Sequence, residues 1–404
     1  MPGRCRALTG CLPYRPRGGS GTPVRLSTQE YVMSQSPAHS ALSSLSAHSV
    51  PTNGPLAAPP GARHRMAAVP GGGRIHLVEQ GTGPLVLLVH GFPEGWYSWR
   101  HQLPALAAAG YRAVAVDVRG YGRSSKPGAV ADYRMLAHVA DNAGVVHALG
   151  ERTATVVGHD WGATIAAHSA LLRPDVFTAA ALLGVPYTPR EGTPPTEVFG
   201  ALGGAEEFYV GYFQRPGRAE AEIEADVRGW LAGFYASLSA DTMAGPETDP
   251  GPERGSASGP GSRHRPGAAR NGGGGPYFVP EGGRMADRFV VGTLPGWLSE
   301  SELDAIAGEF ERTGLTGALN RYRNVDRDWA DLAAWDGAPL RVPSLFVGGE
   351  LDASAAWLAP AIEAFPRTVP DLRGSHLLPG CGHWVQQERP EEVNRLLVGW
   401  LANL

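Results

Sequence analysis

Residues 156–163 read "VVGHDWGA", and this stretch decides how the chain around it folds. Gly158, Asp160 and Gly162 have the spacing of a nucleophile elbow, in which a strand turns sharply into a helix and the middle residue projects at the edge of a sheet. That position usually holds serine, whereas here it holds aspartate. The stretch therefore predicts a strand up to residue 159, a helix after Asp160, and a carboxylate nucleophile between them.

Apolar runs of strand length lie on both sides of the elbow. They cover residues 74–80, 84–90, 111–117, 154–159, 179–185, 343–352 and 375–384. Helix-like stretches separate most of them, and continuous apolar strands alternating with helices are typical of a mostly parallel sheet covered on both faces. The predicted fold class is α/β.

The alternation stops between residues 190 and 329. This region holds aromatic-rich, helix-like segments and no run typical of a buried strand. It predicts a helical cap domain inserted between the runs 179–185 and 343–352, which are taken as the sixth and seventh strands of the sheet. The core then consists of residues 71–189 and 330–404. Within the cap, residues 244–275 are rich in Gly and Pro and are expected to form a flexible surface loop.

Residues 1–70 are expected to be a disordered N-terminal extension, because they mix Arg, Ser, Pro and Gly with a single acidic residue, Glu30. The composition resembles an organellar transit peptide. The alternative is that the natural protein starts at Met66, which is followed by a turn and a strand-like run. On either reading, a chain that begins at Met66 is expected to fold and to stay active.

The charge distribution excludes several classes of partner. The net charge is −4, and most of the excess basic charge lies in the N-terminal extension, so the folded part is acidic. We therefore expect neither nucleic acid nor a membrane surface as partner. Apolar runs are too short to span a bilayer. Three cysteines (Cys5, Cys11, Cys381) indicate no disulfide framework and favour a reducing, cytoplasmic compartment; Cys381 is interpreted as a small buried residue, and no metal or cofactor is expected.

A nucleophile needs a base and a group that orients the base. His383 in "GCGHW" follows a glycine-rich turn and precedes a helix, so it is favoured as the base over His376, which lies in a strand-like run. Asp352 lies just beyond the end of the seventh strand and is favoured over Glu350 as the orienting acid. The order nucleophile, acid, histidine is the one expected for this architecture.

The segment "HGFPE" (residues 90–94) predicts the other half of the site. The backbone N–H groups of Phe92 and of Trp161, the residue after the nucleophile, can together form an oxyanion hole. The bond between Phe92 and Pro93 is a candidate for the cis form, which occurs almost only before proline.

An aspartate nucleophile favours a particular kind of electrophile. A carboxylate that attacks an ester or amide forms a reactive anhydride, whereas attack on a saturated carbon with a leaving group forms an ordinary ester. Epoxides and alkyl halides are the natural substrates for such attack. Water activated by His383 would then hydrolyse the ester of Asp160.

With these motifs in order, the sequence resembles the soluble epoxide hydrolases of the α/β-hydrolase superfamily. The resemblance covers residues 74–404 apart from the 244–275 loop, and it rests on "HGFPEGWYSWRHQ", "DVRGYGRSS", "GHDWG", "YFQRPG", "RYRNVDRDW" and "GCGHW". It implies an α/β-hydrolase fold with a cap, and hydrolysis of an epoxide to a vicinal diol. A homodimer is left open.

The resemblance also implies two tyrosines in the cap that donate to the epoxide oxygen. They match Tyr209 and Tyr322, although Tyr212 competes with Tyr209 for the first position. A phenol can donate a hydrogen bond and then a proton to the developing alkoxide. Together with Pro93, Trp384 beside the base is expected to contact an apolar substrate.

Two rival functions use the same residues. A dehalogenase would share Asp160 and His383, but haloalkane dehalogenases typically have Asn at the position of Phe92, and fluoroacetate dehalogenases typically have Arg at that of Trp161. A non-catalytic ligand receptor on the same fold would be expected to lack part of the machinery, and no part is missing here.

Overall fold

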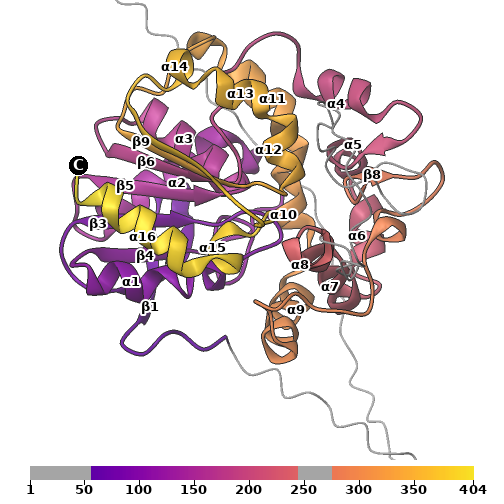
Figure 1. The fold of residues 1–404 in the computed structure, drawn as a ribbon, viewed down its shortest axis with the longest axis horizontal. Helices are drawn as coiled ribbons and strands as arrows, with labels where there is room; N and C mark the ends of the chain where they lie inside the picture. Colours follow the sequence, from indigo (N-terminus) through magenta and orange to yellow (C-terminus); the bar gives the residue numbers. More distant parts are fainter. Residues whose placement is uncertain (1–55, 244–274) are drawn as a thin grey trace, which may run out of the picture. The chain divides into compact units, whose positions relative to one another are not determined.

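The structure is a computed structural model that describes residues 56–243 and 275–404. An eight-stranded sheet in the order β1-β2-β4-β3-β5-β6-β9-β10 forms its centre (Figure 1). The strands are β1 (Arg63–Ala68), β2 (Arg74–Gln80), β3 (Leu85–Val89), β4 (Arg112–Val116), β5 (Ala154–His159), β6 (Phe177–Leu183), β9 (Ser344–Gly349) and β10 (Leu372–Leu378), and a separate pair, β7 (Glu207–Phe208) and β8 (Phe278–Val279), lies in the cap.

Along the chain, helices lie between the strands and after the last strand. They are α1 (Gln102–Ala108), α2 (Met135–Ala148), α3 (Trp161–Leu172), α4 (Pro195–Gly203), α5 (Tyr209–Gln214), α6 (Arg218–Ile223), α7 (Val227–Ser237), α8 (Ala240–Met243), α9 (Glu300–Thr313), α10 (Thr316–Asn320), α11 (Val325–Asp331), α12 (Ala353–Trp357), α13 (Ala359–Glu363), α14 (Phe365–Thr368), α15 (Val385–Glu388) and α16 (Pro390–Leu401). Short 3-10 helices cover Pro70–Gly72, Trp96–Trp99, Val130–Tyr133, Met285–Arg288, Tyr322–Asn324 and Ala333–Trp335.

The sheet is mostly parallel, as the sequence predicts. Only β2 runs antiparallel to its neighbours β1 and β4, and β3, β4, β5, β6, β9 and β10 pair in parallel. Parallel strands bring their carboxyl ends to the same edge of a sheet, which is where open α/β folds bind ligands. The loops after β3, β5, β9 and β10 therefore meet at one edge.

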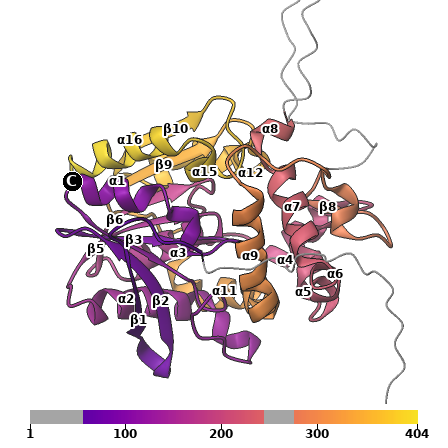
Figure 2. The same ribbon diagram turned by 90° about the horizontal axis from the view of Figure 1, so that it is seen from below.

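Strand β3 shows why the buried strands have no polar face. Leu85, Leu87 and Val89 belong to the core that includes α2 and α3, while Val86 and Leu88 belong to the core that includes α1 and α16. Figure 2 shows α1 and α16 on one side of the sheet and α2 on the other. Each fully buried side chain of this kind stabilises the fold by about 1.5–3 kcal/mol, so apolar residues occupy successive positions.

Helices α4 to α11 lie between β6 and β9, the sixth and seventh strands of the sheet, and this inserted segment is called the cap below. That it forms a separate domain stays a prediction. It is not purely helical, because Glu207 pairs with Val279 and Phe208 with Phe278 in the two-stranded β7–β8 sheet. Two-residue strands carry too little pattern to be predicted from sequence. Apart from residue 275, the loop expected at 244–275 lies outside the described residues.

The expectation of disorder up to residue 70 is wrong for residues 63–68. These residues form β1, which pairs with β2 from Arg63 opposite Glu79 to Ala68 opposite Arg74. All but one of the β1 side chains are exposed, so the strand has no apolar alternation that a sequence pattern could show. Residues 1–55, expected to be disordered, lie outside the described part.

This strand changes the expectation for a chain that begins at Met66. The truncation removes half of β1, the hydrogen bond between His64 and His76 (3.0 Å) and the ion pair of Arg65 with Glu79 (3.0 Å). We expect its melting temperature to fall by a few degrees relative to a chain that begins at Leu56, since each hydrogen bond contributes about 1 kcal/mol. Thermal unfolding of both chains measures this, and equal melting temperatures would show that β1 adds nothing.

Candidate active site

Asp160 stands at the turn from β5 into α3, in a backbone conformation that few residues adopt. Its φ of 53° is the only positive φ of a non-glycine residue in the described part of the chain. The flanking glycines make the turn possible. A Cβ atom on Gly158 would lie 1.9 Å from the carbonyl oxygen of Gly162, and one on Gly162 would lie 2.0 Å from that of Val89. The elbow predicted from the sequence is therefore present, and its strain is held by close packing.

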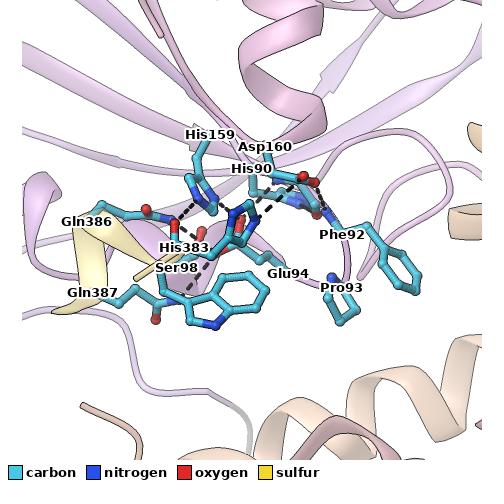
Figure 3. A network of polar contacts seen from close by, with 12 residues as sticks. His90, Phe92, Pro93, Glu94, Ser98, His159, Asp160, His383, Gln386 and Gln387 are labelled. Atoms are coloured by element: carbon cyan, nitrogen blue, oxygen red, sulfur yellow. Dashed lines mark hydrogen bonds and ion pairs between the residues drawn. The ribbon is translucent and has the colours of Figure 1, made fainter. Parts of the chain in front are cut away.

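The two predicted oxyanion-hole residues adjoin the nucleophile. The N–H of Phe92 donates to Asp160 Oδ1 over 2.9 Å (Figure 3). A hydrogen bond from the backbone N–H of Trp161 also favours the ionised carboxylate. The bond between Phe92 and Pro93 is cis, as expected. Both N–H groups thus bind an oxygen of the carboxyl group that would carry the substrate.

His383 lies between Asp160 and Asp352. Its Nε2 is 3.7 Å from Asp160 Oδ2, and its Nδ1 is 2.9 Å from Asp352 Oδ2. The competing residues lie elsewhere: His376 is exposed in β10, and Glu350 accepts from the N–H of Gly380. The structure therefore brings together the nucleophile, base and acid that the sequence favours.

Burial and charge act in opposite directions on these groups. Burial opposes the charge of His383, but Asp352 and then Asp160 outweigh it and raise the pKa of His383 to about 9. Burial also raises the pKa of Asp160, although His383 partly offsets this rise. Burial works against ionised Asp352 as well, yet the His383 charge lowers its pKa overall. With a pKa of about 9, His383 is positively charged at neutral pH and lies between the carboxyl groups of Asp160 and Asp352.

Two tyrosines of the cap lie near Asp160, and burial, helped by the negative charge of Asp160, raises the pKa of both phenols. Tyr209 begins α5, Tyr322 begins a short 3-10 helix, and their ring centroids are 5.9 Å apart. The Tyr322 ring also lies 5.4 Å from that of Phe92 and 5.2 Å from that of Trp161. Burial, followed by the charge of Asp160, raises the pKa of Tyr209, so its phenol stays protonated.

The structure also separates Tyr209 from its competitor. The hydroxyl of Tyr212 donates to Glu222 over 2.5 Å, and the guanidinium of Arg218 lies 4.1 Å from the centre of its ring. Tyr212 is therefore engaged within the cap, whereas the electrostatic environment of Tyr209 includes Asp160 and Asp352.

Trp384 and Pro93, expected to contact substrate, are both held by the cap residue Tyr235. The indole N–H of Trp384 donates to the Tyr235 carbonyl (3.1 Å), and the Tyr235 hydroxyl donates to the Pro93 carbonyl (2.5 Å). The Trp384 ring is fully buried, 4.8 Å from that of His383. Contact with substrate stays a prediction for both residues. Cys381 is buried, as the sequence suggests.

The buried pair of Glu94 and His159, which the sequence analysis missed, contacts the backbone of His383. The ring of His159 reaches the carbonyl oxygen of His383 with Nε2 and the carboxylate of Glu94 with Nδ1, each over 2.9 Å (Figure 3). Both partners are acceptors, and a ring that donates from both nitrogens carries a positive charge. Burial opposes ionisation of Glu94, but His159 outweighs it and lowers its pKa. Gln386 and Gln387 also donate to this carboxylate.

Glu94→Gln is expected to destabilise the fold by roughly 3 kcal/mol, because it removes one partner of a buried ion pair. The loss is measured by urea unfolding of the variant, of His159→Gln and of the double variant. Glu94 also helps to raise the pKa of His383, so the variant lowers that pKa and shifts the acid limb of ester hydrolysis to lower pH. A variant as stable as the wild type, with an unchanged pH profile, would contradict this account.

Two further searches of the described residues concern metals and membranes. Within residues 56–243 and 275–404, no group of three or more His, Cys, Asp or Glu side chains is arranged to hold a metal ion. In the same ranges, none of the helices has both the length and the apolar character needed to cross a bilayer.

Comparison with known proteins agrees with this arrangement. A family model described as the alpha/beta hydrolase fold matches residues 84–222. Epoxide hydrolase B of Mycobacterium tuberculosis is 43% identical over 352 residues, which cover 82% of this chain and 96% of the relative. Among solved structures, an epoxide hydrolase from an endophytic Streptomyces is similar with a TM-score of 0.77 and 65% identity (85% of this chain, 96% of the other), and epoxide hydrolase A of Mycobacterium thermoresistibile with 0.73 and 40% (84% and 98%). Relatives this similar over most of their length share the fold, and the chain belongs to the epoxide hydrolase family within the α/β hydrolases.

Proposed function

We propose that this protein hydrolyses an apolar epoxide to a vicinal diol through a covalent ester of Asp160. The observation that supports this most is the carboxylate at the elbow, with His383 Nε2 at 3.7 Å and the phenols of Tyr209 and Tyr322 within reach of its charge. A carboxylate forms a stable ester with a saturated carbon, and an epoxide supplies such a carbon together with a leaving oxygen that needs a proton.

In the first step, Asp160 attacks a ring carbon and the bond from that carbon to the epoxide oxygen breaks. The oxygen becomes an alkoxide, which accepts a hydrogen bond and then a proton from Tyr209 or Tyr322. This step consumes no base. The positive charge of His383 stabilises the ionised nucleophile before the attack.

In the second step, His383 becomes the base. Esterification removes the negative charge of Asp160, one of the charges that raise the pKa of His383, so the ring releases its proton more readily. This proton restores the phenol that protonated the alkoxide. Neutral His383 then takes a proton from water as the water attacks the carboxyl carbon. The resulting oxyanion lies where Asp160 Oδ1 now accepts from Phe92. Its collapse breaks the bond from the carboxyl carbon to the substrate oxygen, which leaves as the diol after taking the proton from His383, and the carboxyl proton of Asp160 then returns to His383.

Two assays run side by side distinguish this function from its rivals. A chromogenic epoxide and a halide-release substrate are offered to the same preparation. We expect epoxide turnover and no halide release. Halide release alone would establish a dehalogenase, and two silent assays would favour a non-catalytic receptor.

The ester itself is tested by one turnover in heavy-oxygen water. The label is expected in the carboxylate of Asp160 and not in the first diol, because water attacks the carboxyl carbon. Heavy oxygen in that first diol would mean that water attacks the epoxide directly and that Asp160 is a general base.

A further inference from the structure

Tyr277 is a buried tyrosine whose hydroxyl has no hydrogen-bond partner among the described residues. Other buried tyrosines do have one: the hydroxyl of Tyr133 donates to the Pro127 carbonyl (2.8 Å), and that of Tyr187 donates to the Ala338 carbonyl (2.7 Å). An unpaired buried donor destabilises a protein by about 1–3 kcal/mol. Phenylalanine would therefore serve better at position 277 if the residue only filled space.

The backbone fixes Tyr277 beside Tyr209. The N–H of Tyr209 donates to the carbonyl oxygen of Tyr277 over 2.9 Å, next to the β7–β8 pairing of Phe208 with Phe278. The ring centroids of the two tyrosines are 5.6 Å apart. Tyr277 is thus placed by the same small sheet that carries one of the proposed proton donors.

The charges around the phenol place it on the Asp352 side of the site. Burial first, and then the negative charge of Asp352, raise the pKa of Tyr277 well above its ordinary value, and Asp160 contributes in the same direction. The side chain of Ser354, two residues after Asp352, lies near enough to interact with the phenol and acts against this rise, but it forms no hydrogen bond of good geometry with the hydroxyl. The hydroxyl is therefore a permanent donor close to the catalytic carboxylates.

Aromatic packing holds the ring in place. The ring of Trp357 in α12 lies 4.7 Å from that of Tyr277, and it also contacts Phe208 and Phe278. A side chain fixed on two sides loses little freedom when its hydroxyl binds a ligand. Tyr277 is in this sense a preorganised hydrogen-bond donor.

We propose that Tyr277 determines specificity by donating a hydrogen bond to an oxygen that the substrate carries beside its epoxide ring. The proposal rests on the proposed epoxide hydrolysis and names a substrate class for it: epoxides with a hydroxyl, ether or carbonyl oxygen close to the ring. Tyr209 and Tyr322 already supply the donors for the epoxide oxygen, so a third buried donor serves a second acceptor. A substrate without that acceptor leaves the donor unpaired and is disfavoured.

The test compares two substrates that differ by one hydroxyl, trans-β-methylstyrene oxide and phenylglycidol. The measured quantity is the ratio of kcat/KM for phenylglycidol to kcat/KM for the hydrocarbon epoxide. In Tyr277→Phe this ratio is expected to fall about tenfold or more, while the melting temperature stays the same or rises, because no protein hydrogen bond of good geometry is lost. Tyr187→Phe is the matched control: it loses the bond to the Ala338 carbonyl, so its melting temperature falls and its ratio stays that of the wild type.

The outcomes separate the inference from the function on which it rests. An unchanged ratio in Tyr277→Phe, or an equal loss on both substrates, overturns the role of Tyr277 and leaves epoxide hydrolysis intact. A wild type that turns over neither epoxide overturns both. A ratio that falls equally in Tyr187→Phe shows a general effect of losing a buried phenol, and this also contradicts the proposal.

Discussion

His383→Gln is expected to accumulate the alkyl ester of Asp160 and to release diol about 10²- to 10⁴-fold more slowly than the wild type, the range typical of losing a general base. Ring opening needs the carboxylate of Asp160 and the phenols of the cap, whereas hydrolysis of the ester needs a base. The trapped ester appears in a mass spectrum of the intact protein as one added substrate mass. Peptide mapping is expected to place that mass on Asp160.

Asp160→Asn is the matching control, because an amide is too weak a nucleophile to form the adduct. Asp352 is buried and loses the partner at 2.9 Å when His383 is replaced, so thermal unfolding of His383→Gln shows whether the variant remains folded. A folded His383→Gln protein that forms no adduct would show that the histidine acts before or during ring opening.

Replacing Tyr209 and Tyr322 together by Phe is expected to lower epoxide turnover almost to background. Loss of one well-placed donor to an oxyanion commonly slows a reaction about 10²- to 10³-fold, so each single variant keeps partial activity through the remaining phenol. Initial rates with a chromogenic epoxide measure the three variants. The adduct should also fail to form in the double variant, because the missing donors act in the first step.

Tyr212→Phe is the control for this experiment, since the hydroxyl of Tyr212 bonds Glu222 and takes no part in the proposed reaction. Its turnover is expected to match the wild type. If instead the double variant keeps the wild-type rate, then the leaving group needs no proton, and dehalogenation becomes the better-supported function.

The fold was predictable because its central strands are buried on both faces. Apolar residues at successive positions, as in Leu85 to Val89, leave a signal that single-sequence reading detects. Strand β1 leaves none, because nearly all its side chains face solvent and the backbone ladder with β2 supplies its stability. The short strands β7 and β8 escape prediction for a different reason, since their pairing spans a segment of about seventy residues.

Site residues were predictable where a short sequence motif determines their geometry. The glycines around Asp160 and the turn before His383 are readable as motifs, because their geometry is set within a few residues. The pair joins Glu94, in the loop after β3, to His159 at the end of β5, and these residues are far apart in the chain, so only the structure shows that each is the other's counter-charge. Tyr277 follows a glycine-rich run and resembles a loop residue until its neighbours are known.

The loops at the edge of the sheet and the inserted cap each supply part of the proposed catalytic residues, so the proposed reaction needs both parts close together. Asp160 follows β5 and His383 follows β10, whereas Tyr209 and Tyr322 come from the inserted cap, which Tyr235 ties to the Pro93 carbonyl. Any movement that separates the cap from the sheet would withdraw the proposed proton donors from the proposed nucleophile. Ring opening is then confined to a substrate already enclosed, and a nucleophile exposed to solvent meets no acid to assist it.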